Sequence, residues 1–183
     1  MAEKELPSIM KWADKTTGEF HRKPSIFRDA VSVDGSTGFK AEKGRYHLYV
    51  SYACPWAHRT LVGRTLKGLE DVITVDVVDY LMLDKGWRFS PEKADCTPDT
   101  VNGFEYLREA YFKARPDYEG RFMVPVLWDK HQQTIVNTES SDILRMLNSE
   151  FNDFSATPEQ ATLDLYPVHL RPAIDKLNDW IYK

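Results

Sequence analysis

The stretch from Tyr49 to Arg59, Tyr-Val-Ser-Tyr-Ala-Cys-Pro-Trp-Ala-His-Arg, constrains the fold more than any other part of the chain. Residues 47–51 alternate polar and apolar types and are rich in aromatic and β-branched side chains, so they predict a short β-strand. The strand must stop at Pro55, which has no N–H for a strand ladder and suits the first position of a helix. Apolar residues then recur at helical spacing as far as Leu66. The pattern therefore predicts a strand, a short turn and a helix, with Cys54 at the helix N-cap.

Cys54 at an N-cap meets backbone N–H groups and the positive end of the helix dipole. His58 and Arg59 follow one turn later, and each of these features favours thiolate over thiol. The alternative is that Cys54 is a small buried hydrophobic residue, as most free cysteines are. The order of strand, cysteine, proline and helix favours a nucleophile.

The residue three positions after Cys54 decides what kind of nucleophile it is. That residue is Ala57, so no neighbouring thiol can resolve a disulfide in the manner of a Cys-x-x-Cys motif. A lone thiolate is expected to form a mixed disulfide with a small thiol, which a second small thiol then releases.

The composition indicates a globular protein of a reducing compartment. The chain has 183 residues and a hydrophobic content of 42%, which is ample for a core. Its net charge of −4, without a Lys/Arg cluster, gives no electrostatic support for nucleic-acid binding. Cys54 and Cys96 do not make a disulfide scaffold, residues 1–12 lack the apolar run of a secretory signal, and no stretch approaches membrane-spanning length. We therefore expect a cytoplasmic protein without nucleic-acid or membrane partners.

The pattern after the first helix continues an α/β fold. Residues 71–78 are nearly continuous apolar and β-branched types, which predicts a second strand parallel to the first through a right-handed crossover. A loop from Asp79 to about Asp99 follows, and residues 99–114 have helical composition. Trp87 stands beside Gly86 in that loop, and from the residues alone we expect it to fold back onto the core.

Residues 121–129 are strand-like but contain Pro125, which cannot donate to a ladder. A proline at the start of such a strand is a candidate cis peptide, and the Val124 backbone would then be available to an extended peptide ligand. Residues 134–136 predict a further strand, paired with 121–129 across a polar turn.

The segment from Asn137 to Asp142 predicts the start of another helix. Asn137 or Thr138 can cap it, and Glu139 and Asp142 suit its first turn, so an ordinary helix start explains the pattern. The same atoms also suit a ligand. The first-turn N–H groups and the Ser140 hydroxyl would bind a carboxylate, and Glu139 would pair with an ammonium group, which together complement an α-amino acid zwitterion.

The two ends of the chain differ from its middle. Residues 1–45 are polar and rich in glycine, which predicts an extended arm anchored by the isolated aromatic residues Trp12, Phe20 and Phe27. Residues 165–183 predict an amphipathic helix with its start marked by Pro172. A helix so rich in aromatic residues needs a partner surface, so we expect a fragment or short form of a protein with a helical second domain.

Four runs together carry a resemblance to a known family: Val50-Ser-Tyr-Ala-Cys-Pro-Trp-Ala-His-Arg59, Leu81-Met-Leu-Asp-Lys-Gly-Trp87, Val124-Pro-Val-Leu-Trp-Asp129 and Asn137-Thr-Glu-Ser140. From about Phe20 onward, the chain resembles the glutathionyl-hydroquinone reductases, the Xi-class relatives of the omega glutathione transferases. The resemblance implies an α/β fold with a thioredoxin-like N-terminal domain, followed by the start of an all-helical C-terminal domain. It divides the chain into an arm (1–45), the thioredoxin-like glutathione-binding domain (46–150), a linker (151–164) and the first helix of a truncated helical domain (165–183).

The resemblance also implies roles for particular residues. It assigns Cys54 as the nucleophile and reverses the expectation for Trp87, which becomes the aromatic wall of a glutathione site. The remaining implied glutathione contacts are Arg121, the Val124 backbone, and a γ-glutamyl clamp made by Glu139 and Ser140. The family's helical domain supplies tyrosines for the quinol ring and surfaces for a homodimer, and here only its first helix is expected.

The implied function is removal of glutathione from an S-glutathionyl-hydroquinone, with glutathione as co-substrate, an aromatic quinol conjugate as partner and no metal. Three alternatives stay open. One is omega-like thiol transfer or dehydroascorbate reduction through the same sulfur, a second is a truncated glutathione-binding module without catalysis, and a third is a structural protein with an unreactive Cys54.

Overall fold

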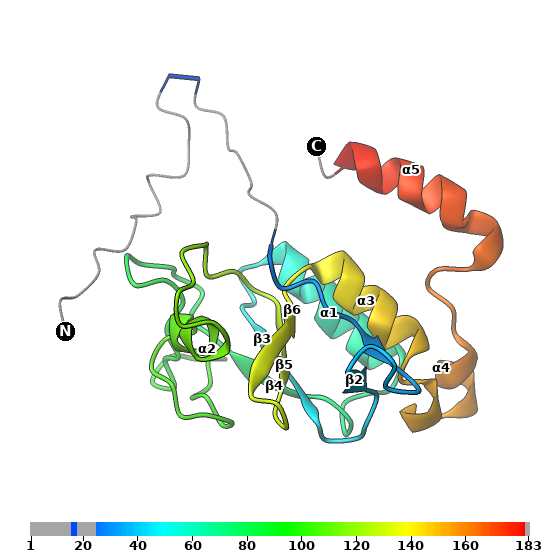
Figure 1. The fold of residues 1–183 in the computed structure, drawn as a ribbon, viewed down its shortest axis with the longest axis horizontal. Helices are drawn as coiled ribbons and strands as arrows, with labels where there is room; N and C mark the ends of the chain where they lie inside the picture. Colours follow the sequence, from blue (N-terminus) through cyan, green and yellow to red (C-terminus); the bar gives the residue numbers. More distant parts are fainter. Residues whose placement is uncertain (1–15, 18–24, 182–183) are drawn as a thin grey trace.

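A four-stranded mixed sheet forms the centre of the protein, in a computed structural model that describes residues 16–17 and 25–181 (Figure 1). The strand order is β4-β3-β5-β6. β3 and β4 are parallel, β5 is antiparallel to β3, and β6 is antiparallel to β5, which confirms the predicted crossover and hairpin. The strands are β3 (Tyr46–Val50), β4 (Thr74–Val77), β5 (Val126–Asp129) and β6 (Thr134–Asn137).

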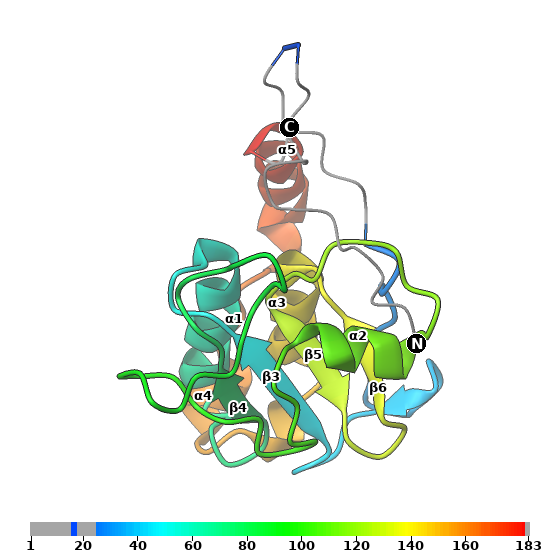
Figure 2. The same cartoon turned by 90° about the vertical axis from the view of Figure 1, so that its left-hand side faces the viewer.

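Helices cover both faces of this sheet. α1 (Pro55–Leu66) and α3 (Ser140–Ser149) pack together on one face, and α2 (Arg108–Ala114) lies against the other (Figure 2). Because both faces are covered, every residue of β3 and β5 is buried. The arrangement confirms the predicted thioredoxin-like α/β fold.

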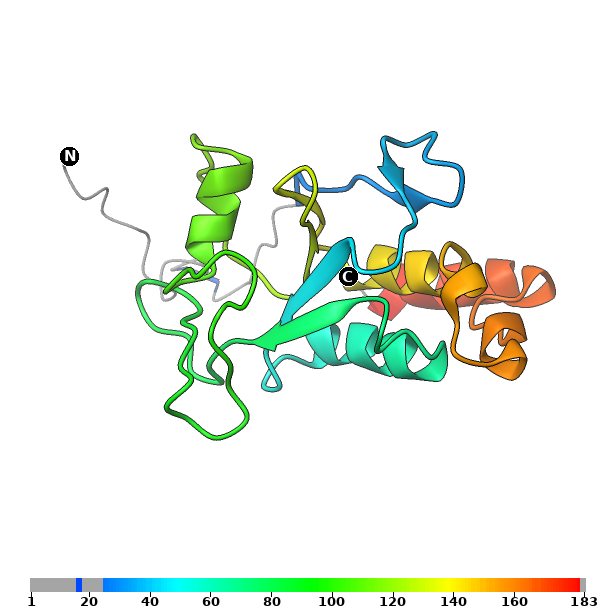
Figure 3. The ribbon, with the colours of Figure 1, turned by 90° about the horizontal axis from the view of Figure 1, so that it is seen from below.

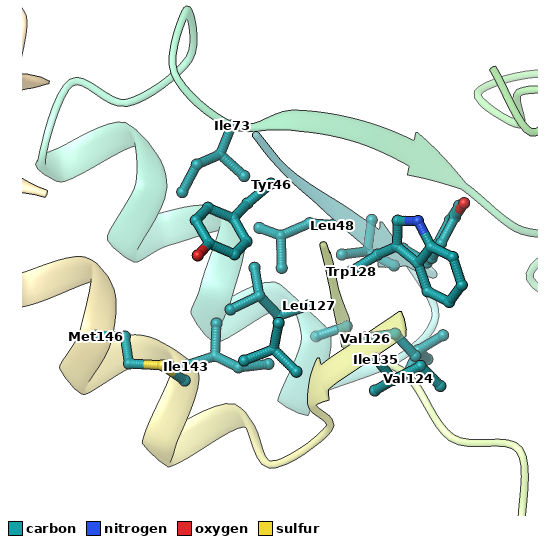
Figure 4. Close-up of a cluster of buried hydrophobic side chains, with 14 of the residues drawn as sticks. Tyr46, Leu48, Ile73, Val124, Val126, Leu127, Trp128, Ile135, Ile143 and Met146 are labelled. Atoms are coloured by element: carbon teal, nitrogen blue, oxygen red, sulfur yellow. The ribbon is translucent and has the colours of Figure 1, made fainter. Parts of the chain in front are cut away.

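The core on the α1/α3 side is built from alternate residues of the central strands. Tyr46, Leu48 and Leu127 point from the sheet towards Ile143 and Met146 of α3, and Trp128 points away on the opposite side (Figure 4). Successive side chains of a strand alternate between its faces, so neighbouring residues serve two different cores. Full burial of one such aliphatic side chain stabilises the fold by roughly 1.5–3 kcal/mol.

α1 approaches α3 through small residues. Its buried positions are Ala57, Thr60 and Gly63, and a side chain at Gly63 would collide with Leu144 of α3. The larger apolar residues of the predicted helical pattern do not all face the core, because Val62 is 43% exposed and Leu66 is 42% exposed.

The described part of the predicted arm is more closely integrated than an extended anchor. β1 (Val31–Ser32) and β2 (Phe39–Lys40) form a small parallel pair, and Phe27 is buried. The Asp29 N–H donates to the Val136 carbonyl at 3.0 Å, so the arm adds to the free edge of β6. The other two predicted anchors, Trp12 and Phe20, lie outside the described residues.

The helix predicted over residues 99–114 forms only at its end, as α2. The Asp99 carboxylate instead accepts hydrogen bonds from the backbone N–H groups of Val101, Asn102 and Phe104. These bonds stabilise a turn that competes with helix, as Asp side chains commonly do.

The last part of the chain consists of short helices and one longer helix. Among the described residues, no helix is long and apolar enough to cross a membrane. α5 stands away from the sheet beyond α3, and within 171–181 none of its side chains is fully buried (Figures 1 and 2). The elements are two 3-10 helices, η2 (Asn152–Phe154) and η3 (Val168–Leu170), and the α-helices α4 (Pro158–Thr162) and α5 (Arg171–Ile181).

Candidate functional site

The sheet topology brings the predicted site residues to one edge of the sheet. β3 ends at this edge and leads to Cys54, and β4 runs parallel to β3, so the loop that contains Trp87 begins there too. β5 runs the opposite way, so its start beside Val124 lies at the same edge. β6 is again parallel to β3 and leads to Glu139. Figure 3 shows this edge, where the arrow of β4 points and the loop after β4 begins. Ligand sites of α/β sheets favour such an edge.

Cys54 occupies the N-cap of α1, as predicted. Its backbone is extended, with φ −100° and ψ 111°, and Pro55 opens the helix. The Cys54 carbonyl accepts the first helical bond, from the His58 N–H at 3.1 Å. The thiol is half-buried and donates to the Val124 carbonyl at 3.7 Å. The sulfur therefore lies at the start of α1 and faces the backbone that precedes Pro125.

Two cationic residues follow Cys54 in the first turn of α1. The Arg59 guanidinium stacks 4.5 Å above the ring centroid of Trp56, and His58 is exposed. Because Cys54 lies at the N-cap, first-turn backbone N–H groups and the positive end of the helix dipole are arranged to favour a thiolate.

The peptide bond between Val124 and Pro125 is cis, as predicted. Two tyrosines, the buried Tyr111 and the half-buried Tyr118, hold the loop that leads into it. The Tyr111 hydroxyl donates to the Met123 carbonyl at 2.8 Å and accepts from the Met123 N–H at 2.9 Å, and the Tyr118 hydroxyl donates to the Arg121 carbonyl at 2.7 Å. Burial raises the pKa of Tyr118 to about 12, so this hydroxyl keeps its proton at neutral pH.

The start of α3 differs from the prediction in one respect. Glu139 itself is the N-cap residue, in place of Asn137 or Thr138. The Asn137 side chain accepts from the Glu139 N–H at 2.7 Å and so forms a turn just before the helix. Ser140 is 2% exposed, and its hydroxyl finds no hydrogen-bond partner among the described residues. This hydroxyl and the first-turn N–H groups are donors of the kind that bind a carboxylate.

Trp87 combines features of both expectations for it. Its side chain is half-buried and packs against the core, and its indole N–H has no hydrogen-bond partner among the described residues. The Trp87 carbonyl accepts from the Leu107 N–H at 2.9 Å, which fixes this part of the loop. Gly86 has φ +85° and faces the side chain of Phe122, next to the half-buried Arg121. The residue before Trp87 therefore lies close to the residue after Arg121.

Sequence reasoning named Asn137 and Asp142 at the start of α3 but not their contacts, and it did not identify Tyr111 and Tyr118 as residues that support the site. Tyr111 and Tyr118 hold the loop before Pro125, while Asn137 and Asp142 organise the turn before α3. The two tyrosine types were visible in the sequence, but Tyr111 holds Met123 across twelve positions of the chain, which no local pattern indicates. Among the described residues, no cluster of three or more His, Cys, Asp or Glu side chains could hold a metal ion.

The fold and this edge define a class: thioredoxin-like proteins with a single cysteine at the start of the first helix of the domain. Residues 53–150 match the sequence profile of the family "Glutathione S-transferase, N-terminal domain". The chain therefore belongs to the glutathione S-transferase family through its N-terminal domain.

Two curated relatives illustrate the similarity. The chain is 53% identical over 174 residues to "Glutathione S-transferase omega-like 2" of Schizosaccharomyces pombe, covering 95% of this chain and 55% of the relative. It is 49% identical over 179 residues to "Glutathionyl-hydroquinone reductase YqjG" of Escherichia coli, covering 93% of this chain and 53% of the relative. The chain thus spans about half the length of these relatives.

Solved structures agree with this placement. The Xi glutathione-S-transferase of Phanerochaete chrysosporium superposes with a TM-score of 0.85 at 52% identity, over 90% of this chain and 52% of that one. A glutathione-bound structure of YqjG from Escherichia coli superposes with a TM-score of 0.80 at 50% identity, over 85% of this chain and 51% of that one. These neighbours confirm the resemblance to the Xi class.

Proposed function

We propose that the protein is a glutathione-dependent reductase that removes glutathione from S-glutathionyl-hydroquinones through Cys54. The observation that carries the proposal is the position of the Cys54 thiol, at the start of α1 and against the Val124 carbonyl. The resemblance to glutathionyl-hydroquinone reductases, and the glutathione bound to one of them, support the choice of substrate.

The proposed reaction has two steps. The Cys54 thiolate attacks the sulfur of the conjugate, so that an S–S bond forms and the bond between sulfur and the ring carbon breaks. The ring carbon takes that electron pair and a proton, and free hydroquinone leaves. A second glutathione thiolate then attacks the mixed disulfide, releases glutathione disulfide and restores Cys54. Glutathione is thereby oxidised and the conjugate is reduced, without a metal.

The same edge offers a site for the glutathione peptide. The Val124 backbone would pair with it as an added strand, and when Cys54 loses its proton the Val124 carbonyl becomes available to a ligand N–H. Glu139, the Ser140 hydroxyl and the start of α3 would hold the γ-glutamyl ammonium and carboxylate. Trp87 would form an apolar wall, and Arg121 would supply a positive charge beside the tripeptide.

The test follows the sulfur by mass spectrometry. After incubation with glutathione disulfide, wild type should gain one glutathione on Cys54, Cys54→Ser should gain none, and the matched control Cys96→Ser should behave as wild type. Cys54→Ser should still bind glutathione, because backbone and clamp hold the peptide. Turnover of a glutathionyl-hydroquinone by Cys54→Ser at a wild-type rate would contradict the covalent mechanism.

A second candidate uses the same sulfur on other substrates. The similarity to an omega-like transferase favours glutathione thiol transfer or dehydroascorbate reduction. Parallel assays with a glutathionyl-hydroquinone, a mixed disulfide and dehydroascorbate separate the two activities. A Cys54 adduct that forms without turnover of any of these substrates would indicate a glutathione-binding module.

We further propose that residues 46–150 form the glutathione-binding domain and that residues 165–183 form the first helix of a helical domain. The family's helical domain would complete the quinol pocket and supply the surfaces of a homodimer. Two free thiols, Cys54 and Cys96, suit a reducing compartment such as the cytoplasm. Light scattering of the full-length protein would measure the oligomeric state.

A further inference from the structure

We propose that Arg28 is a positioning residue for the glutathione site, because it holds and neutralises Asp142 in the first turn of α3. The inference rests on the proposed function, since it concerns how the clamp of Glu139 and Ser140 is held. Arg28 belongs to the arm, far from this helix in the sequence.

The arm segment that carries Arg28 pairs with the end of β6. Arg28 and Asn137 form an isolated antiparallel bridge. On one side of it the Asp29 N–H donates to the Val136 carbonyl at 3.0 Å, and on the other the Thr138 N–H donates to the Phe27 carbonyl at 3.2 Å. The arm therefore fixes the backbone that leads directly into Glu139.

A chain of side-chain contacts continues from Arg28 into the clamp. The Arg28 Nε forms an ion pair with the Asp142 Oδ2 at 2.6 Å. The Asn137 Nδ2 donates to the same carboxylate oxygen at 3.3 Å and to the Asp29 carbonyl at 2.9 Å. Its Oδ1 accepts from the Glu139 N–H at 2.7 Å. Asn137 thus links the Arg28–Asp142 pair to the N-cap of α3.

The charges give Arg28 a second role. Asp142 places a carboxylate in the first turn of α3, next to the N–H groups proposed to receive the γ-glutamyl carboxylate. The carboxylate of Asp142 would repel a ligand carboxylate bound at the same helix turn, and the positive charge of Arg28 offsets this repulsion. Without Arg28, the negative charge of Asp142 would lower the affinity for an anionic ligand.

The same segment also contacts the other half of the site. The Phe27 ring lies 5.6 Å, between centroids, from Tyr111 and 5.6 Å from Tyr118. The hydroxyls of these tyrosines hold the backbone of Arg121 and Met123 before the cis bond. Residues 27–28 thus contact both the loop before Pro125 and the start of α3. These two parts of the proposed site belong to different elements of the fold.

The experiment measures glutathione affinity by titration calorimetry in wild type and four variants. Arg28→Gln should raise the Kd of wild type about five- to tenfold, and Arg28→Lys should restore most of the affinity because it keeps the charge. The double variant Arg28→Gln/Asp142→Asn should bind within about twofold of wild type, since it removes the repulsion. The matched control is Arg145→Gln, because the ion pair of Arg145 with Asp175 has the same length, 2.6 Å, and starts from the same helix α3. This control should bind as wild type does.

The outcomes separate the inference from the function on which it rests. Equal affinity of wild type and Arg28→Gln would overturn the positioning role while leaving the proposed function intact. A loss in Arg28→Gln that neither Arg28→Lys nor the double variant repairs would also overturn it, because a purely structural defect behaves in that way. Absence of glutathione binding by wild type would overturn the proposed function, and the inference with it.

Discussion

Cys54 and Cys96 are both half-buried thiols, yet their surroundings set different reactivities. Cys96 donates to the Val78 carbonyl at 3.9 Å, and burial raises the pKa of its thiol, with Asp79 adding to the effect. A raised pKa means that less of Cys96 is thiolate at any pH below that value. Cys54 lies at the N-cap of α1, whose first turn offers backbone N–H groups and has no acidic side chain.

We therefore predict that iodoacetamide alkylates Cys54 before Cys96 at neutral and mildly acidic pH. Peptide mass spectrometry after short exposures gives the two rates. Cys54→Ser should leave the slow rate of Cys96 unchanged, which controls for coupling between the thiols. Faster labelling of Cys96 would refute the assignment of the nucleophile.

Ser140 offers a way to separate binding from folding. Its buried hydroxyl has no hydrogen-bond partner among the described residues, so Ser140→Ala should cost the fold little, and the free energy of unfolding should change by less than about 1 kcal/mol. If the hydroxyl binds the γ-glutamyl carboxylate, the same change should weaken glutathione binding by about 1–2 kcal/mol. Thermal unfolding and calorimetry on the same samples measure both quantities. A large loss of stability with unchanged affinity would assign Ser140 to the fold alone.

At the scale of elements, a buried ion pair joins β3 to the β5–β6 hairpin. Arg45 precedes the strand residues of β3 and contacts both carboxylate oxygens of Asp129, with an Nη2–Oδ2 distance of 2.6 Å. Asp129 is fully buried and also accepts from the His131 N–H in the turn at 2.8 Å. The hydrogen bond to Asp129 raises the pKa of Arg45, which keeps its charge at every pH of interest.

Asp129→Ala should therefore destabilise the protein by about 3–5 kcal/mol, because it removes the two-oxygen partner of the buried Arg45 and, among the described residues, leaves only Glu42, at 3.6 Å, beside that charge. Denaturant unfolding measures this loss. Asp117→Ala is the control: Asp117 pairs with Arg115, but its side chain is 79% exposed, so its loss should cost less than about 1 kcal/mol. Similar costs for both variants would contradict the argument from burial.

Elements with local signals were predictable from the sequence, and elements that depend on distant partners were not. The strand before Cys54, the helix after Pro55, and the cis bond at Pro125 each follow from a few adjacent residues. The helix expected over 99–114 is mostly a loop, because Asp99 binds backbone N–H groups there. The Asn137 side chain serves the turn before Glu139, which is why it is not the cap.

Some residues of the candidate site could be proposed from local sequence, but the residues that support them could not. Cys54, Val124 and Glu139 stand out in sequence because a proline or a helix start lies beside each of them. The residues that hold them, such as Tyr111 and Arg28, act through contacts more than ten positions away in the chain. Such contacts leave no local periodicity, so only the folded structure reveals them.

At the scale of the whole molecule, hydrogen bonds join residues 161–165, which precede α5, to the C-terminal ends of α1 and α3. These ends lie away from the candidate site. Lys67, just after α1, is fully buried and donates through Nζ to the carbonyls of Ala161 and Leu163, at 3.1 and 2.6 Å. Asn148 accepts from the Leu165 N–H at 2.6 Å. Burial lowers the pKa of Lys67, but the two carbonyls suit its ammonium form.

Lys67→Met tests whether the two hydrogen bonds of Lys67 hold the segment before α5 in place. Methionine keeps the apolar stem of the side chain but removes both hydrogen bonds, so residues 155–165 should open more often and limited proteolysis there should accelerate. Glutathione affinity should stay unchanged, because the length of α1, about 18 Å for a helix of this size, separates Lys67 from Cys54. Lys113→Met, at an exposed position of α2, is the matched control and should match wild type in both assays. Cleavage at the wild-type rate in Lys67→Met would mean that the apolar contacts of this segment hold it without the lysine.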